Sequence, residues 1–464
     1  MPGGNRPTVV LFGVLGLLIF LFRWGIIAWG SDSFVEDPDA YRSIAATLHK
    51  TGVFGITTID GQVKPTAYRP PLYPVMLSWF FDSGGPALRS SHLALAHAAL
   101  GCLASLGSAW IFLQLTRLQR DNSSEPMARA SESTIHRGII LASAIVALDP
   151  ILLRQSQLLM TETLAVFLTV AAACLLIWSV RSNSIPNANL CYGSGVLLGL
   201  GTVCRPATLV WCILICVVFA LVYRPWKRSR PAIRSLVLLI AGFLLCVLPW
   251  AWRNARAVDR WTFTTTHGGY TLLLANNPSL YEHLQQTWSR NWDDTTFQDR
   301  WRDQSEAGRS EREQDQYANS LAWKTISEQP FNFVKSCLVR ELWLWAPWPN
   351  QSGWQTQAVI GTWYSVLYCL SLCGGWQLAG TSKHHTSIRF LFYVLLALIL
   401  SISMVHGVYW SNMRMRAVCI PAFAIFSAWA YCRSARRYAL ASRSRSGSLG
   451  HAECESSDPA SSDR

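Results

Sequence analysis

Long apolar runs alternate with charged or polar stretches over most of the chain. Because a membrane-spanning helix needs about 20 apolar residues, these runs predict about ten spans. We expect them at Thr8–Trp29, Ser91–Leu115, Gly138–Leu153, Leu158–Val180, Cys191–Val203, Ala207–Tyr223, Leu236–Trp252, Trp354–Leu378, Phe390–Trp410 and Ala417–Tyr431. The third run is broken by Asp149 and Pro150. The fold class that this pattern predicts is an all-α polytopic membrane protein.

Two long polar regions, at about residues 31–90 and 253–350, interrupt this alternation. The first contains an amphipathic pattern at helical spacing. Its apolar face carries Tyr41, Ile44, Ala45 and Leu48. Just before it, Asp37 is suited to cap free helix amides, and Pro38 is suited to the first helical position. We therefore expect amphipathic helices within the two long loops.

Arginine and lysine are concentrated in the short connections, and with ten spans these connections all fall on one side. Positive residues in short loops mark the cytoplasmic side of a membrane protein. Both chain ends are therefore predicted to be cytoplasmic, and both long loops to lie on the external, periplasmic face of the cell (inner) membrane. We expect a membrane domain over residues 1–434 and a disordered cytoplasmic tail over 435–464, rich in basic residues, then in Ser, Asp and Glu.

The composition agrees with a membrane protein, since 51% of the 464 residues are hydrophobic and 14% are charged. A net charge of +13 would also suit nucleic-acid binding. The basic residues mostly flank the apolar runs, however, so they indicate membrane topology rather than a nucleic-acid partner. Of the 13 cysteines, only Cys337 is predicted to be external, so the sequence predicts no disulfide framework.

Charged side chains gather where the predicted spans meet the external face. They are Asp37 and Asp39 after the first span, Arg69 in the first loop, Glu162 at the fourth span, Arg205 after the fifth, Arg253 after the seventh, and Arg414 and Arg416 before the tenth. A carboxylate can act as a general base on a hydroxyl group, and arginines can hold a phosphate. A lipid phosphate lies at this depth of a bilayer, so the cluster favours chemistry on a phospholipid-like substrate.

The same residues also have purely structural interpretations. Asp37 can cap a helix, Asp39 can interact with a helix dipole, and Glu162 can occupy a first helical turn. The arginines can anchor helix ends at the membrane interface. The histidines are scattered without the spacing of metal ligands, so we predict no metal site and no other cofactor, while dependence on a divalent metal stays open.

The order of short motifs along the chain resembles one known superfamily. An acidic residue with Tyr four positions later follows the first span, and RPPLYP lies in the first loop. TE then opens a span, CRP follows a glycine-rich span, PWAWRN ends another, and RMR precedes the last, proline-containing span. Together these motifs resemble the GT-C membrane glycosyltransferases of the protein O-mannosyltransferase, aminoarabinose transferase and Rgt-like type. The resemblance covers about residues 8–431.

This resemblance implies a GT-C-like fold and a sugar donor linked to polyprenyl phosphate, used on the outer face of the membrane. Asp37 matches the family's acidic residue that activates the acceptor, and Tyr41 matches the aromatic position of that motif. Arg69 matches the basic residue near the donor phosphate. Glu162 matches a second acidic position, and Arg205 matches the arginine of the CRP motif.

Two stretches depart from the family pattern. Pro38 stands where the family has a second acidic residue, with Asp39 beyond it, and RMRAV from Arg414 stands where the family has RYRxP. The sequence predicts a glycosyltransferase that moves a hexosyl or pentosyl group from polyprenyl phosphate to a lipid, glycan or protein acceptor. We expect inversion, with Asp37 as general base. The alternatives are a polytopic transporter or lipid flippase, and an enzyme of the O-antigen ligase or polymerase type.

Overall fold

The fold was analysed in a computed structural model of the chain. The residues that it describes are 6–30, 34–37, 39–58, 60–82, 87–121, 131–180, 185–226, 230–305, 308–350, 352–383 and 385–435. The predicted tail lies outside these residues, apart from position 435, and so does Pro38.

Among the described residues, seven helices are long and apolar enough to cross a membrane. They are α1 (Arg6–Trp29), α4 (Ser90–Asp121), α7 (Glu162–Ser179), α10 (Arg230–Ala257), α16 (Trp354–Ser382), α17 (Thr386–Val408) and the segment Met413–Ala435, which begins with η3 (Met413–Cys419). An eighth span is the bent pair of α5 (Glu132–Leu148) and α6 (Pro150–Ser156). Two shorter apolar helices, α8 (Ala188–Cys204) and α9 (Ala207–Tyr223), account for the remaining predicted spans.

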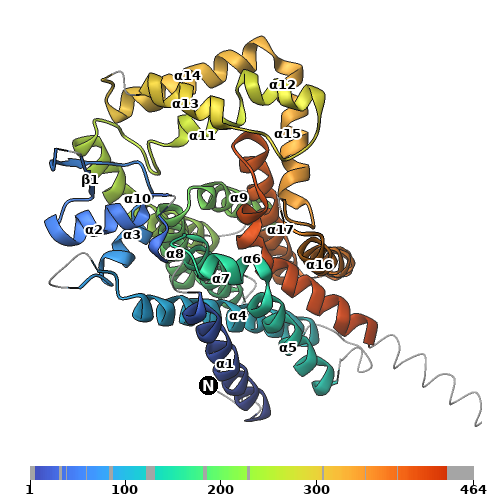
Figure 1. The fold of residues 1–464 in the computed structure, drawn as a ribbon. Coiled ribbons are helices and arrows are strands. Elements are labelled where there is room, and N and C mark those ends of the chain that lie inside the picture. The colour runs from blue at the N-terminus through green and yellow to red at the C-terminus, as the bar shows by residue number, and fades with distance from the viewer. Residues whose placement is uncertain are drawn as a thin grey trace, which may run out of the picture.

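The prediction of an all-α membrane fold is therefore confirmed, with local differences in the helix ends (Figure 1). α4 continues to Asp121, well past the predicted end at Leu115, and α7 begins at Glu162 rather than Leu158. The last span opens as the 3-10 helix η3 before it becomes α-helical. These ends are set by capping and packing, which an apolar run alone does not define.

Two breaks in the spans have clear local causes. Asp149 accepts a hydrogen bond from the Leu152 amide at 3.0 Å and so caps α6, and Pro150 follows at the first helical position. The axis bends by 50° there. Pro206 likewise ends α8 because proline disfavours a helical residue before it, and Arg205 adopts an extended backbone. Both breaks leave polar groups at a helix end inside the bundle.

The first long region folds into α2 (Tyr41–Thr51), the antiparallel pair β1 (Gly55–Thr57) and β2 (Val63–Pro65), and α3 (Leu72–Ser78). The predicted amphipathic helix is present as α2, but it begins at Tyr41 with Ala40 as N-cap, so the predicted start at Pro38 was wrong. The hairpin was not predicted, because its strands are too short to show an alternating pattern.

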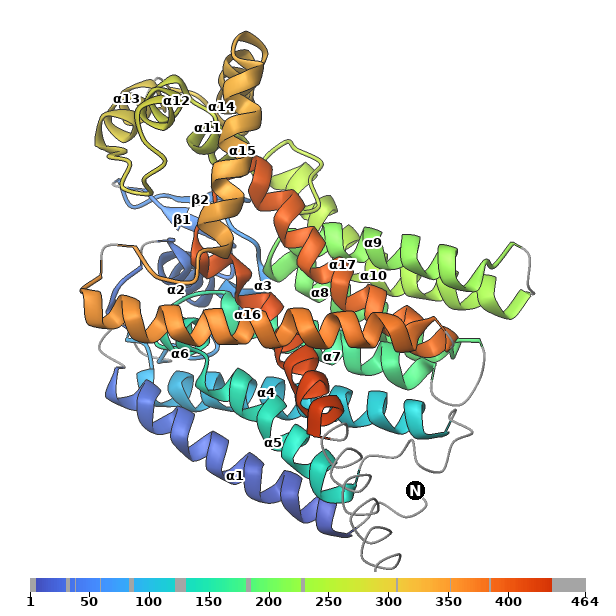
Figure 2. The same cartoon turned by 90° about the vertical axis from the view of Figure 1, so that its right-hand side faces the viewer.

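The described part of the second long region contains five helices and no strand. They are α11 (Gly268–Ala275), α12 (Pro278–Gln286), α13 (Thr295–Ser305), α14 (Glu311–Glu328) and α15 (Pro330–Trp345). Figure 2 shows both long regions at the same end of the span helices, on the left of that view, opposite the start of α1. The predicted arrangement of two long loops on one face is therefore present in the fold.

A clasp, formed by Thr66, Ala67, Thr266 and Glu311, holds the two loops together. The Glu311 carboxylate accepts hydrogen bonds from the Thr66 hydroxyl at 2.6 Å and from the Ala67 amide at 2.9 Å. It also accepts one from the Thr266 hydroxyl, whose amide donates to the Ala67 carbonyl at 3.0 Å. The clasp therefore fixes the strand end that leads directly into Arg69.

Candidate active site

Five charged side chains from distant parts of the sequence form one continuous chain of ion pairs, which we call the charge chain. Its members are Arg69, Asp39, Arg414, Glu162 and Arg205. Arg69 binds Asp39 Oδ1 at 2.8 Å, and Arg414 lies 3.6 Å from Asp39 Oδ2. Arg414 Nε lies 3.4 Å from Glu162 Oε1, and Arg205 Nη1 lies 2.9 Å from the same oxygen.

Each member of the charge chain lies at or near the end of a helix or strand, on the side of the bundle that carries the two long loops. Asp39 precedes α2, Glu162 is the first residue of α7, and Arg205 follows the last residue of α8. Arg414 lies in η3, and Arg69 lies between β2 and α3. All five residues belong to the cluster predicted from the sequence, and the fold brings them together.

The charge chain contains three guanidiniums and two carboxylates, so it carries one excess positive charge. Its inner end is withdrawn from water, since the side chain of Glu162 is only 2% exposed and that of Arg205 is 10% exposed, whereas that of Arg414 is 29% exposed. Burying ions is costly unless they are paired, and the uncompensated guanidinium raises that cost. An anion of matching geometry would offset it, so the charge chain is suited to bind a phosphate.

Aromatic rings enclose the Arg69 end of the charge chain. The Arg69 guanidinium carbon lies 4.6 Å from the centre of the Tyr68 ring and 5.6 Å from that of Tyr41. Burial raises the pKa of the Tyr41 phenol, so this side chain is neutral at physiological pH. Burial and the Arg69 charge lower the pKa of His267, which packs on Tyr68, to about 3. The rings of Tyr41 and His267 near the Arg69 end of the charge chain are therefore uncharged.

Asp37 precedes Asp39 by two residues but is not part of the charge chain, and it is only half-buried. Its Oδ1 accepts a hydrogen bond from the Arg42 amide at 3.0 Å, and its Oδ2 accepts one from the Ser43 amide at 2.9 Å. The predicted capping of α2 is thus present, although Asp37 caps it from three residues before the N-cap. Each oxygen keeps a free lone pair, so a further hydroxyl can still donate to it. Its role as a base stays a prediction.

Two other predicted residues lie outside the charge chain. Arg253 donates to the Thr66 and Phe54 carbonyls, each at 2.5 Å, and so supports the first loop. Arg416 is fully buried and donates to the Leu344 and Ala346 carbonyls at 2.7 and 2.6 Å. These contacts are with backbone rather than with carboxylates. They correspond to the structural interpretation that the sequence had left open.

Sequence reasoning missed two methionines beside the charge chain. Met160 Sδ lies 3.4 Å from Arg414 Nη1, and Met415 Sδ lies 2.7 Å from Arg205 Nη2. It also missed Glu311, which positions the strand before Arg69. The local sequence gives no sign of these contacts. A methionine in an apolar run is typical of a core residue, and Glu311 is typical of the first turn of an exposed helix. Within the described part of the chain, no group of three potential metal ligands is found.

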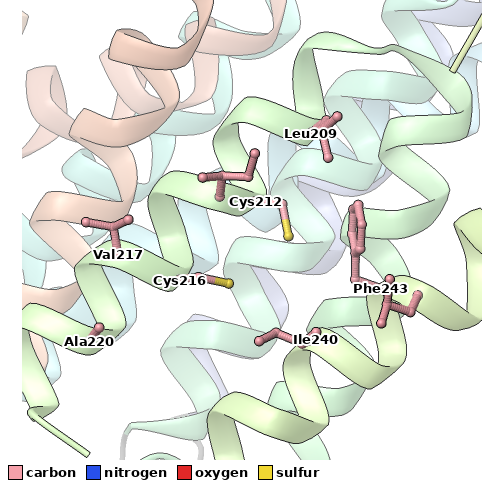
Figure 3. A pocket seen from close by; sticks show the side chains of 9 residues that line it. Leu209, Cys212, Cys216, Val217, Ala220, Ile240 and Phe243 are labelled. Atoms are coloured by element: carbon pink, nitrogen blue, oxygen red, sulfur yellow. The ribbon is translucent and has the colours of Figure 1, made fainter. Parts of the chain in front are cut away.

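A cavity of about 430 Å³ lies between α9 and α10. Its lining is apolar and consists of Leu209, Cys212, Ile213, Cys216, Val217, Ala220, Ile240, Phe243 and Leu244. Figure 3 shows Cys212 and Cys216 of α9 facing Ile240 and Phe243 of α10. The lining contains none of the charged residues, but it starts at Leu209, one helical turn after Arg205.

Comparison with known proteins gives one family match. The family model of dolichyl-phosphate-mannose-protein mannosyltransferase matches residues 130–264. This stretch contains Glu162, Arg205 and Arg253, while Asp37 and Arg414 lie outside it. No curated protein matches the chain.

Several solved structures also match the chain. An oligosaccharyltransferase from Archaeoglobus fulgidus, tethered with an acceptor peptide, has a TM-score of 0.49 and 17% identity, over 89% of this chain and 49% of that one. The archaeal oligosaccharyltransferase AglB from Archaeoglobus fulgidus, in complex with an inhibitory peptide and a dolichol-phosphate, has a TM-score of 0.47 and 16% identity, over 89% of this chain and 50% of that one. This chain therefore spans about half the length of each of these two archaeal chains.

ArnT from Cupriavidus metallidurans, bound to undecaprenyl phosphate, has a TM-score of 0.40 and 12% identity, over 93% of this chain and 79% of that one. The family match over residues 130–264 contains the TE, CRP and PWAWRN motifs in the expected order. The chain thus resembles the GT-C membrane glycosyltransferases, as its motifs predicted, through its similarity to the dolichyl-phosphate-mannose-protein mannosyltransferases.

Proposed function

We propose that this protein is a membrane glycosyltransferase that moves a sugar from a polyprenyl-phosphate donor to an acceptor hydroxyl on the external face. The observation that carries this proposal is the charge chain, with its excess guanidinium at the loop end of the bundle. The match to a family named for a dolichyl-phosphate-linked sugar supports the class of donor. In this proposal the charge chain lies at the external face of the inner membrane, and both chain ends are cytoplasmic.

The donor phosphate would bind to Arg69, Arg205 and Arg414. Their ion-pair partners are carboxylate side chains, which can shift when an anion enters, although Arg69 Nε also donates to the Asp39 carbonyl at 2.7 Å. Negative charge on the departing phosphate is the largest electrostatic demand of the reaction, and preorganised guanidiniums in a poorly solvated site meet it well. Arg205 can serve this role only with its guanidinium directed to the loop face, where its contact with Glu162 holds it.

The polyprenyl chain would follow the apolar cavity along α9. That cavity begins one turn after Arg205 and continues through Cys212, Cys216 and Ala220 on the same face of the helix. A phosphate at Arg205 would therefore have an apolar surface beside it, running toward the other side of the membrane. This arrangement supports an amphiphilic donor with a charged head and a long hydrocarbon tail.

The chemical step would be a single displacement. The acceptor hydroxyl oxygen attacks the anomeric carbon and gives its proton to Asp37. The bond from that carbon to the phosphate oxygen breaks, and its electron pair leaves with the polyprenyl phosphate, which the arginines stabilise. Attack from the side opposite the leaving group inverts the anomeric configuration. Asp37 suits the base role because its two amide contacts hold the carboxylate in a fixed orientation.

A transporter or flippase would use polar groups near the membrane midplane. The described charged residues of the spans instead lie near one or the other end of their helices, and some of them are near the end that faces the two long loops. Arg23 is close to the end of α1 at Trp29, Glu162 starts α7, and Arg205 ends α8. This placement favours chemistry at one face over passage through the bundle.

The test uses purified protein in detergent, where the two sides of a membrane no longer differ. Polyprenyl-phosphate mannose, glucose and arabinose are supplied separately, with an extract of the cell envelope as acceptor. An enzyme releases free polyprenyl phosphate from one donor and labels an acceptor, whereas a flippase consumes none of them. Profiling lipid-linked sugars in a strain that lacks the protein names the donor, since that lipid accumulates. No donor consumption and no accumulation would overturn the proposal.

A further inference from the structure

Several buried polar atoms in and beside the charge chain have no hydrogen-bond partner, Arg414 Nε and Thr163 Oγ1 among them. Three others are Glu162 Oε2, His406 Nε2 and Ser411 Oγ. Their side chains are 2%, 8% and 2% exposed, so solvent does not satisfy them. Leaving such a group unsatisfied costs about 1–3 kcal/mol, which makes three in one place unusual for a folded protein.

The three atoms belong to elements that pack on one another. α7, α17 and η3 contact each other in all three combinations. His406 is near the end of α17, Ser411 lies in the link from α17 to η3, and Glu162 starts α7. The charges of Arg205 and Arg414 both act on the His406 ring, and these are the two guanidiniums that contact Glu162. The three residues therefore lie where α7, α17 and η3 meet, at the Glu162 end of the charge chain.

The hydrogen-bonding character of these atoms is specific. His406 Nδ1 lies 2.9 Å from the Trp410 carbonyl, which can only accept, so Nδ1 carries a proton. A second ring proton would add a third positive charge next to two guanidiniums, so Nε2 is a bare acceptor. Glu162 Oε2 is also an acceptor, since the other carboxylate oxygen already serves the arginines. Ser411 can both donate and accept.

Two acceptors and one hydroxyl do not suit a phosphate, whose oxygens are themselves acceptors. They suit a group that offers several O–H donors. Resting on the function proposed above, we propose that Glu162, His406 and Ser411 form the subsite that binds hydroxyl groups of the donor's sugar ring. The arginines then hold the phosphate, and this subsite distinguishes a sugar-loaded lipid from the bare lipid. This subsite is suited to a neutral sugar with several hydroxyl groups.

The test compares two ligands on the purified, detergent-solubilised protein: polyprenyl phosphate, and polyprenyl-phosphate hexose. His406→Phe removes the acceptor and keeps a planar ring. We expect it to bind the sugar-loaded lipid about ten-fold more weakly than wild type, which corresponds to one lost buried hydrogen bond. Its affinity for bare polyprenyl phosphate should stay unchanged. His406→Gln, which can restore an acceptor, should recover part of the loss.

A matched pair of serines provides the control. Ser411→Ala should repeat the selective loss at smaller size. Ser401→Ala should not, because the Ser401 hydroxyl is already bonded to the Leu398 carbonyl of its own helix at 2.8 Å. If His406→Phe does not fold, wild-type protein still provides a test with deoxyhexose donors. At least one deoxy donor should bind about ten-fold more weakly than its parent.

The outcomes separate this inference from the proposed function. If wild type binds polyprenyl phosphate, but no variant and no deoxy donor discriminates sugar-loaded from bare lipid, a bound water satisfies the three atoms and the inference is wrong. An equal loss for both lipids would move His406 to the phosphate site and also overturn it. If wild type binds neither lipid, the proposed function fails, and the inference fails with it.

Discussion

Arg414 and Arg416 lie two residues apart in η3, yet they reach opposite kinds of partner. Arg414 is directed to two carboxylates, Asp39 and Glu162. Arg416 is directed to the carbonyls of Leu344 and Ala346, and its guanidinium carbon lies 4.3 Å from the centre of the Tyr364 ring. A 3-10 helix turns by about 120° per residue, so neighbours two apart face different sides. One short element thus contributes to both the charge chain and the core.

The same division holds for other buried arginines. Arg340 donates to the Gly407 and Ala275 carbonyls, and Arg23 donates to those of Ala147 and Leu152. Backbone carbonyls at helix ends cannot leave their arginine without local unfolding, whereas carboxylate side chains can rotate away. We therefore assign arginines whose partners are all carbonyls to the stability of the fold, and we propose that those with a carboxylate partner in the charge chain can bind a ligand. Arg69 has both kinds of partner, because it also donates to the Asp39 carbonyl at 2.7 Å.

The largest expected effect concerns which carboxylate is the base, Asp37 with its amide partners or Asp39 with its guanidinium partners. Asp37→Asn keeps the size of the side chain and much of its capping ability. It removes the proton acceptor, so transfer should slow by at least about 10²-fold at normal expression. Sugar release from the polyprenyl-phosphate donor is the measurement. Asp39→Asn serves as control, and a dead Asp39→Asn beside a near-normal Asp37→Asn would assign the base to Asp39.

The next effect concerns Arg205 as a phosphate ligand. Arg205→Ala removes a charge-assisted contact, so the KM for the donor should rise by about 10- to 100-fold while the KM for the acceptor changes little. Arg205→Lys should recover only part of this loss, because an ammonium cannot replace the planar fork of the guanidinium. Equal changes for donor and acceptor would instead indicate that Arg205 acts through the fold.

A third effect, on stability rather than on transfer, concerns His267, which joins the second loop to the Arg69 end of the charge chain. Its folded pKa of about 3 lies below the unfolded value of 6.5, so the folded state binds fewer protons between these values. Its contribution to stability is complete above pH 6.5 and is lost as pH falls toward 3, at up to about 1.4 kcal/mol per pH unit. Thermal unfolding of wild type should show this slope, and His267→Phe should flatten it. Parallel curves for both proteins would contradict the assignment.

The spans were predictable because apolar composition decides which segments enter a membrane. Even the short α9 begins and ends where its apolar run does. The start of α2 was not predictable, because Asp37 reaches its amides across an intervening turn. The clasp at Glu311 was also missed, since its partners are 244 and 245 residues away along the chain.

Most residues of the candidate site could be predicted from the sequence. Which of its arginines contact carboxylates and which contact backbone carbonyls could not. Asp39, Glu162, Arg205 and Arg414 all stood at predicted loop ends, and the fold brings them together. Which arginine of the RMR motif faces the carboxylates depends on the 3-10 conformation of η3, which the sequence does not reveal. His406 and Ser411 had no distinguishing pattern, because only the three-dimensional structure shows which buried polar atoms lack a partner.

The most direct test of the two classes of arginine is the affinity of polyprenyl phosphate for Arg414→Gln and Arg416→Gln, measured on the folded fraction of purified protein. The account predicts that Arg414→Gln binds at least about ten-fold more weakly than wild type. Arg416→Gln should bind normally but unfold at a lower temperature, because two buried carbonyls lose their donor. Normal binding by Arg414→Gln together with weakened binding by folded Arg416→Gln would contradict the account.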